Sequence, residues 1–102
     1  MQLGNLDITL EYCASWKYAP RAVSLTEEVL GDRSIEAFVR SWNLRPSAGG
    51  KFELTVNGDL IYSKKQLGRH ANEGECKALI IDKLKEIFPE WDAKKFSGDD
   101  DN

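Results

Sequence analysis

The dipeptide Asn57–Gly58 stands between two short apolar segments, and it limits how this chain can fold more than any other feature. Asn-Gly is favoured in two-residue β-hairpin turns because both residues readily adopt positive φ angles. The flanking segments KFELTV (51–56) and DLIYS (59–63) are rich in the β-branched and aromatic residues of strands. The sequence therefore predicts an antiparallel hairpin over residues 51–63.

A strand and a helix are expected before this hairpin. In LDITLEY (6–12), apolar and polar residues alternate, which is typical of a strand with one buried face. A helix is predicted from about Trp16 or Pro20 to Leu30, because apolar residues recur there at spacings of three and four. Gly31 follows directly and is expected to end it.

The rest of the chain adds a second strand, two loops and a last helix. IEAFVRSW (35–42) is predicted to be a strand, and NLRPSAGG (43–50) a loop because of its Pro, Ser and Gly content. KKQLGRHANEGE (64–75) is predicted to be a mobile polar loop. A helix is predicted over residues 75–88, with Pro89 ending it.

This order predicts an α/β fold with the sequence β-α-β-β-β-α. A strand–helix–strand unit forms a right-handed parallel crossover, and the hairpin adds two antiparallel strands. The expected result is a two-layer sandwich of a four-stranded mixed sheet and two helices. Residues 1–90 are predicted to form one domain and residues 91–102 a polar acidic tail, in which Trp91 and Phe96 are able to dock on the body.

Composition restricts the function of this chain. Its net charge is −3, with three of the negative charges in the terminal GDDDN, which argues against binding nucleic acid by phosphate neutralisation. No apolar run reaches the roughly 18–20 residues of a membrane span. No leader peptide is apparent, so we expect a cytoplasmic protein with no membrane partner and with both cysteines reduced.

Cys13 follows the first predicted strand at a position favourable for an anion. The ends of the first, second and fourth strands and the starts of both helices are expected to gather there, and helix N-termini lower the pKa of nearby thiols. Lys17, Arg21, Arg69 and His70 are candidates to add positive potential. A cysteine at a strand end is also often a small packed hydrophobe, so position alone leaves both roles open.

Two segments resemble the selenoprotein W-like Rdx family. EYCASWKYAPRA (11–22) resembles its signature Y-C-x-x-(C or selenocysteine)-x-(Y/W) followed by R-A, and GGKFELTVNGDLIYSKK (49–65) resembles its middle block. The match runs in order from about Leu6 to Phe88. The resemblance implies a thioredoxin-like fold and a cytosolic redox protein linked to thiols such as glutathione. Glutathione would then be a co-substrate, with no tightly bound cofactor.

The chain departs from this family at the second redox position. Its motif reads Cys13-Ala14-Ser15-Trp16, with Trp16 where the family has a resolving cysteine or selenocysteine. Dithiol exchange requires the second thiol to attack a mixed disulfide, and an indole cannot do so. A CxxC mechanism is therefore excluded within this motif, and Cys13 remains the one catalytic candidate there.

Three alternatives stay open. Cys13 can act as a monothiol whose partner is glutathione or a protein with a thiol or disulfide. Cys76 can act as a resolving thiol, although it falls on the apolar stripe of the last helix and a structural role is the simpler account. The third alternative is a redox-inactive interaction module, in which Trp16, Tyr18 and the 64–75 loop bind a partner protein.

A metal site is not expected. His70 is the only histidine, and together with the two cysteines it lacks the paired spacing of a zinc site. The sequence does not determine the oligomeric state.

Overall fold

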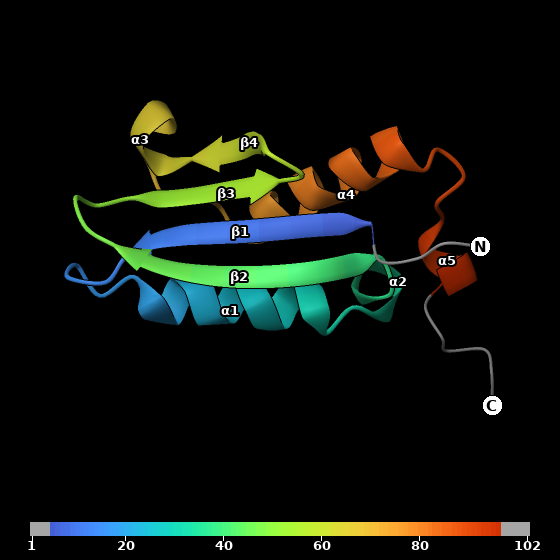
Figure 1. Cartoon of the computed structure of the whole chain (residues 1–102), viewed down its shortest axis with the longest axis horizontal. Coiled ribbons are helices and arrows are strands. Elements are labelled where there is room, and N and C mark those ends of the chain that lie inside the picture. The colour runs from blue at the N-terminus through green and yellow to red at the C-terminus, as the bar shows by residue number, and fades with distance from the viewer. Residues whose placement is uncertain (1–4, 97–102) are drawn as a thin grey trace.

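Four strands form one mixed sheet in the order β2-β1-β3-β4 (Figure 1). The computed structural model describes residues 5–96, without the side chains of residues 95 and 96. The strands are β1 (Leu6–Cys13), β2 (Val39–Ser47), β3 (Phe52–Val56) and β4 (Asp59–Ser63). The helices are α1 (Ala19–Leu30), α2 (Arg33–Glu36), α3 (Lys64–Leu67), α4 (Glu75–Ile87) and α5 (Ala93–Phe96).

The predicted order of strands and long helices is confirmed, with three short helices added to it. β1 pairs in parallel with β2 and antiparallel with β3, and β3 pairs antiparallel with β4. The C-terminal ends of β1, β2 and β4 therefore meet at one edge of the sheet, where Cys13 lies (Figure 1). Within residues 5–96, no helix has both the length and the apolar character needed to cross a membrane.

The apolar face of the sheet is covered by α1 and α4. The alternation predicted for the first strand is confirmed, since Leu6, Ile8 and Leu10 are completely buried while the residues between them are partly exposed. One hydrophobic cluster joins this face to the buried residues of both helices, which are Ala22, Leu25, Val29, Cys76, Ile80 and Leu84. This burial is the main stabilising contribution to the two-layer arrangement.

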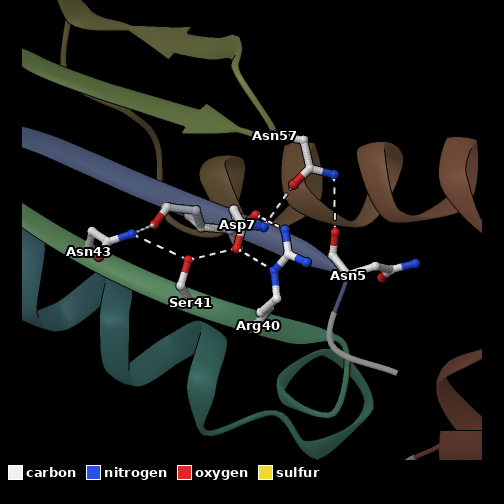
Figure 2. Close-up of polar contacts among 7 residues, drawn as sticks. Asn5, Asp7, Arg40, Ser41, Asn43 and Asn57 are labelled. Atoms are coloured by element: carbon white, nitrogen blue, oxygen red, sulfur yellow. Dashed lines mark hydrogen bonds and ion pairs between the residues drawn. The ribbon is translucent and has the colours of Figure 1, made fainter. Parts of the chain in front are cut away.

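The Asn57–Gly58 turn forms as predicted, with φ angles of 51° and 86°. The side chain of Asn57 also ties the hairpin to the beginning of β1 (Figure 2). Its Oδ1 accepts a hydrogen bond from the Asp7 N–H at 2.7 Å, and its Nδ2 donates to the Asn5 carbonyl oxygen at 3.2 Å. The turn therefore holds β3 against the strand that is central to the sheet.

The strand predicted over residues 35–42 is wrong at its start. Asp32 caps a short helix, α2, by accepting hydrogen bonds from the Ser34 N–H at 3.0 Å and the Ser34 hydroxyl at 2.6 Å. The apolar residues Ile35 and Phe38 enter the core from this helical turn rather than from a strand. Pairing with β1 begins only at Val39.

The loops predicted over residues 43–50 and 64–75 are each partly regular structure. β2 continues to Ser47, and it accommodates Pro46 because it is an edge strand. Residues 64–67 form α3, which Ser63 caps and Gly68 ends with a φ angle of 74°. The first third of the predicted mobile loop is therefore helical.

Packed structure continues beyond Pro89. Trp91 is 8% exposed, and its indole N–H donates a hydrogen bond to the Ser34 carbonyl oxygen at 2.9 Å. This joins the segment after α4 to α2, and α5 lies beside α2 as well. The sequence interpretation made residues 91–102 a polar tail in which Trp91 and Phe96 were able to dock. Trp91 does dock, whereas the Phe96 side chain and residues 97–102 lie outside the described part of the chain.

The opposite face of the sheet carries a polar network centred on Asp7 (Figure 2). The carboxylate of Asp7 accepts hydrogen bonds from Arg40 Nε at 2.9 Å and from the Ser41 hydroxyl at 2.8 Å, and it forms an ion pair with Arg40. The bonds from Arg40 and then Ser41 lower the pKa of Asp7 to about 2. In the same way, the bonds from Arg69 and the Asn72 N–H lower the pKa of Glu75 to about 2.

Stability is expected to fall in acid because of these two carboxylates. Their folded-state pKa of about 2 lies below the ordinary values of 3.8 and 4.5, so their contribution is fully present above about pH 5. That contribution is lost progressively as the pH falls from about 5 to 2. Urea unfolding at a series of pH values should show this loss of stability. Asp7→Asn and Glu75→Gln should each make the free energy of unfolding depend less steeply on pH.

Glu90→Gln provides the control, because Glu90 is exposed and makes no ion pair within residues 5–96. An Asp7→Asn profile as steep as that of Glu90→Gln would contradict the role assigned to Asp7.

Candidate thiol site at the sheet edge

Cys13 is the last residue of β1 and is held by the backbone on two sides. Its N–H donates to the Lys51 carbonyl oxygen at 2.8 Å, and its own carbonyl accepts from the Tyr18 N–H at 3.1 Å. The second bond closes the turn of residues 14–17, all of which are exposed. The Cys13 side chain itself is completely buried next to this exposed turn.

The sulfur atom of Cys13 is surrounded by hydrogen-bond donors. Burial raises the pKa of the thiol, but hydrogen bonds from the Ser15 hydroxyl and from the backbone N–H groups of Gly50, Trp16 and Ser15 outweigh it. The net effect is a pKa below the ordinary value. The Sγ–Oγ distance to Ser15 is 3.3 Å. Donors that converge on one atom stabilise the thiolate, which is the nucleophilic form of cysteine.

Trp16 occupies the second redox position of the motif and packs on Gly50. Gly50 has a φ angle of 76°, and a Cβ atom placed there would lie 2.6 Å from Cζ3 of the indole. Trp16 nevertheless remains 59% exposed, and its ring meets the edge of the Tyr18 ring at a centroid distance of 6.2 Å. The indole therefore lies beside a residue that donates to the Cys13 sulfur while presenting most of its own surface to solvent.

The four predicted cations are not what lowers the pKa of Cys13. Arg69 is committed to a bidentate ion pair with Glu75, at 2.8 Å and 2.9 Å. Burial, followed by the charges of Arg21 and Lys64, lowers the pKa of His70, which leaves its imidazole neutral at pH 7. Hydrogen bonds within the site, rather than neighbouring side-chain charges, favour the thiolate.

Cys76 has very different surroundings. It lies in the first turn of α4, is 4% exposed and belongs to the main hydrophobic cluster, which does not include Cys13. Burial and the charges of Glu75 and Glu28 raise its pKa to about 12, so the thiol stays protonated. Both cysteines are free in this structure. A resolving role for Cys76 stays a prediction, and the protonated state of its thiol opposes it.

The aromatic surface required for an interaction module is present in part. Tyr18 lies between Trp16 and His70, with a centroid distance of 4.7 Å to the His70 ring. The ammonium group of Lys64 lies 5.9 Å from the centre of the Tyr18 ring. The structure therefore brings the start of the first helix and the 64–75 segment together, as the sequence interpretation required.

A groove of about 480 Å³ lies between α1 and the segment that leads into α4. Sequence interpretation missed this groove, although Arg21, Ser24 and Glu28 recur at the spacing of one helix face. The residues that line the groove are Arg21, Ser24, Leu25, Glu27, Glu28, Phe52, His70, Ala71, Asn72, Glu73, Gly74 and Cys76.

Within residues 5–96, no group of three or more His, Cys, Asp or Glu side chains could hold a metal ion.

Comparison with known families decides the classification of this chain. Residues 7–82 match the model of the Rdx family. The chain belongs to the Rdx family. This confirms the resemblance seen in the segments around Cys13 and around the hairpin.

Solved structures agree with the Rdx assignment. A selenoprotein W-related protein from Vibrio cholerae is 26% identical and superposes with a TM-score of 0.72, covering 79% of this chain and 99% of its own. A protein from Bordetella parapertussis has the same fold at 24% identity and a TM-score of 0.72, covering 78% of this chain and 99% of its own. The thioredoxin-like fold class is therefore confirmed. No curated protein matches the chain.

Proposed function

We propose that this Rdx protein is a single-cysteine thiol redox protein that reacts through Cys13, with glutathione as its co-substrate. Membership of the Rdx family supports a redox-related role in general. The observation that carries the specific proposal is the set of hydrogen-bond donors around the Cys13 sulfur, which lower the thiol pKa although the side chain is buried. A sulfur atom with a purely packing role would not require these donors.

The proposed reaction is thiol–disulfide exchange in two steps. The Cys13 thiolate attacks the glutathione sulfur of a mixed disulfide between glutathione and a partner thiol. The new bond joins Cys13 to glutathione, and the partner sulfur leaves with the electron pair and takes a proton. A second glutathione thiolate then attacks the glutathione sulfur bound to Cys13, which forms glutathione disulfide and restores the Cys13 thiolate. The second glutathione supplies the sulfur that Trp16 cannot.

The direct test is the pH dependence of alkylation at each cysteine, measured by mass spectrometry on the reduced native protein. For Cys13 we expect a midpoint below the free-thiol value of about 8.5, and for Cys76 protection until the protein unfolds. Glutathione-dependent reduction of a mixed disulfide should be lost in Cys13→Ser. The matched control, Cys76→Ser, should retain both the activity and the Cys13 profile.

The second candidate function is a redox-inactive interaction module. It is favoured by the contrast between a completely buried Cys13 and a Trp16 that is 59% exposed. In that case Cys13 would resist alkylation in the native protein, and Cys13→Ser would change no activity. Trp16→Ala would instead weaken binding of the partner.

A further inference from the structure

Positive charge gathers at the edge of the sheet where Cys13 lies. Several basic residues belong to the turn, the helix starts and the strand ends that meet there, and none of their side chains forms an ion pair within residues 5–96. These residues are Lys17, Arg21, Arg45, Lys64 and Lys65. Their charges are therefore free to meet a partner.

The acidic side chains of this edge do not cancel that charge. Glu11 is already paired with Lys51 at 3.4 Å. Glu75 is already paired with Arg69 at 2.8 Å. The carboxylates near the edge that have no ion pair in the described residues are Glu53 and Glu73. The edge is therefore cationic, although the whole chain has a net charge of −3.

The cations that lie closest to the exposed indole of Trp16 form one surface with it. Lys17 follows Trp16 directly in the chain. The ring of Trp16 meets the edge of the Tyr18 ring, and the ammonium group of Lys64 lies 5.9 Å from the centre of that ring. Arg21 lies in the first turn of α1, for which Tyr18 is the N-cap. We call the side chains of Lys17, Arg21 and Lys64 the cationic rim.

The reaction proposed for Cys13 makes no use of the cationic rim, because hydrogen bonds rather than these charges favour the thiolate. Lys17 also has a φ angle of 64°, which strains an L-residue and which glycine would adopt freely. The turn itself therefore gives no reason for a lysine at this position. A contact made with another molecule does give one.

We propose that the cationic rim docks an acidic segment of a protein substrate, so that Cys13 reacts preferentially with mixed disulfides whose partner cysteine lies among Asp and Glu residues. This inference rests on the redox reaction proposed above and adds the class of protein that the reaction serves. The rim supplies the ion pairs, and Trp16, which is 59% exposed, supplies an apolar contact to the same segment. Charge complementarity of this kind mainly raises the rate of association.

The size of the effect follows from the exposure of the rim. Lys17 and Arg21 are exposed and Lys64 is half-buried, so each ion pair is expected to change the rate by at most about five-fold. Together they should give a preference of about ten-fold at low salt. The Debye length shrinks from about 10 Å at 0.1 M to about 3 Å at 1 M ionic strength, so this preference should almost vanish at about 1 M NaCl.

Three peptides with blocked termini, each glutathionylated on a central cysteine, test the preference. The cysteine is flanked on both sides by aspartates in the first peptide, by lysines in the second and by serines in the third, while the glutathione is the same in all. Above the uncatalysed exchange at low salt, kcat/KM for glutathione-dependent release of the peptide thiol should be about ten-fold higher for the aspartate peptide than for the serine peptide. The lysine peptide should react most slowly. Equal rates for the three peptides at low salt would overturn the proposal.

Charge reversal within the rim should remove the preference. Lys17→Glu and Lys64→Glu should each lower the ratio of the aspartate rate to the serine rate by about five-fold. The ratio is the readout because a new charge near Cys13 also changes the reactivity of the thiol toward every peptide. Lys94→Glu is the matched control, because it changes the net charge equally but lies exposed on α5 at the opposite end of the molecule (Figure 1). If Lys94→Glu lowered the ratio as much as Lys64→Glu, net charge rather than the rim would set the preference, and the proposal would be wrong.

Binding to the Cys13→Ser variant tests the rim without the reaction. In a titration followed by ¹H–¹⁵N NMR, an aspartate peptide with alanine in place of cysteine should shift the amide signals of residues 15–18 and 64–67. The lysine peptide should leave these signals unchanged, and an oligothymidylate of the same charge should bind more weakly than the aspartate peptide. Oligothymidylate binding of equal or greater strength would mean that the rim takes polyanions in general, which contradicts the proposal.

The two measurements separate the failure of the rim from the failure of the redox reaction. If the aspartate peptide binds but Cys13 proves unreactive, only the redox proposal is contradicted. If Cys13 turns over all three glutathionylated peptides equally and the aspartate peptide does not bind, only the assignment of the cationic rim is contradicted.

Discussion

Replacing Trp91 with alanine is expected to lower the free energy of unfolding by about 3–5 kcal/mol, which is typical when a buried tryptophan is truncated. The side chain is 8% exposed and belongs to the main hydrophobic cluster. Its indole N–H also satisfies the Ser34 carbonyl oxygen. The substitution therefore removes apolar burial and leaves an acceptor without its donor.

Urea denaturation followed by far-UV circular dichroism measures this effect without relying on tryptophan fluorescence. Trp16→Ala is the matched control: Trp16 is 59% exposed, and its truncation should change stability by less than about 1 kcal/mol. Trp91→Phe should retain most of the burial but lose the hydrogen bond, at a cost of about 1–3 kcal/mol. If Trp91→Ala were no more destabilising than Trp16→Ala, the segment after Pro89 would contribute nothing to the fold.

Replacing Gly50 with alanine is expected both to destabilise the protein and to raise the pKa of Cys13. At a φ angle of 76° an L-residue is strained by roughly 1–2 kcal/mol, and the added Cβ atom would lie 2.6 Å from the indole of Trp16. Either the ring or the backbone must move. Because the Gly50 N–H is one of the donors to the Cys13 sulfur, a backbone shift weakens the stabilisation of the thiolate.

Gly49→Ala separates the effect of backbone strain from the effect of the contact with the Trp16 indole. Gly49 has a similar φ angle of 79°, but an added Cβ atom would have no neighbour within 4 Å. This control should show the backbone strain alone, with the alkylation profile of Cys13 unchanged. Adding Trp16→Ala to Gly50→Ala should recover part of the stability. Equal effects of Gly49→Ala and Gly50→Ala on both measurements would mean that the Trp16 contact has no role at the thiol.

The sequence interpretation was wrong about where β2 begins and ends, and both errors have a physical explanation. Ile35 and Phe38 are both buried, and a short apolar segment of this kind does not distinguish a strand from a helical turn. The Asp32 side chain accepts a hydrogen bond from the Ser34 N–H, and this N-cap favours the helical turn. Pairing with β1 then extends β2 to Ser47. That pairing joins residues that are distant in sequence, so local composition at residues 43–47 indicated only a loop.

The importance of Cys13 was accessible from sequence, but its chemical environment was not. The position at the strand end and the motif Cys13-Ala14-Ser15-Trp16 identified the thiol. Sequence reasoning then assigned the positive potential to neighbouring cations, whereas the structure assigns the lowered pKa to hydrogen bonds. One donor, Gly50, reaches the sulfur only because β3 pairs with β1 and brings residues 50 and 51 beside Cys13.

The sequence by itself determined the hairpin turn, the two long helices, the alternation of β1 and membership of the Rdx family. These features depend on local backbone preferences and on short-range periodicity, which adjacent residues specify. Tertiary structure alone decided the donors around Cys13, the contact of Trp16 with Gly50, the burial of Trp91 and the charged groove. Each of these requires two or more distant segments to pack together, and their geometry is set by strand pairing and core packing rather than by any one segment.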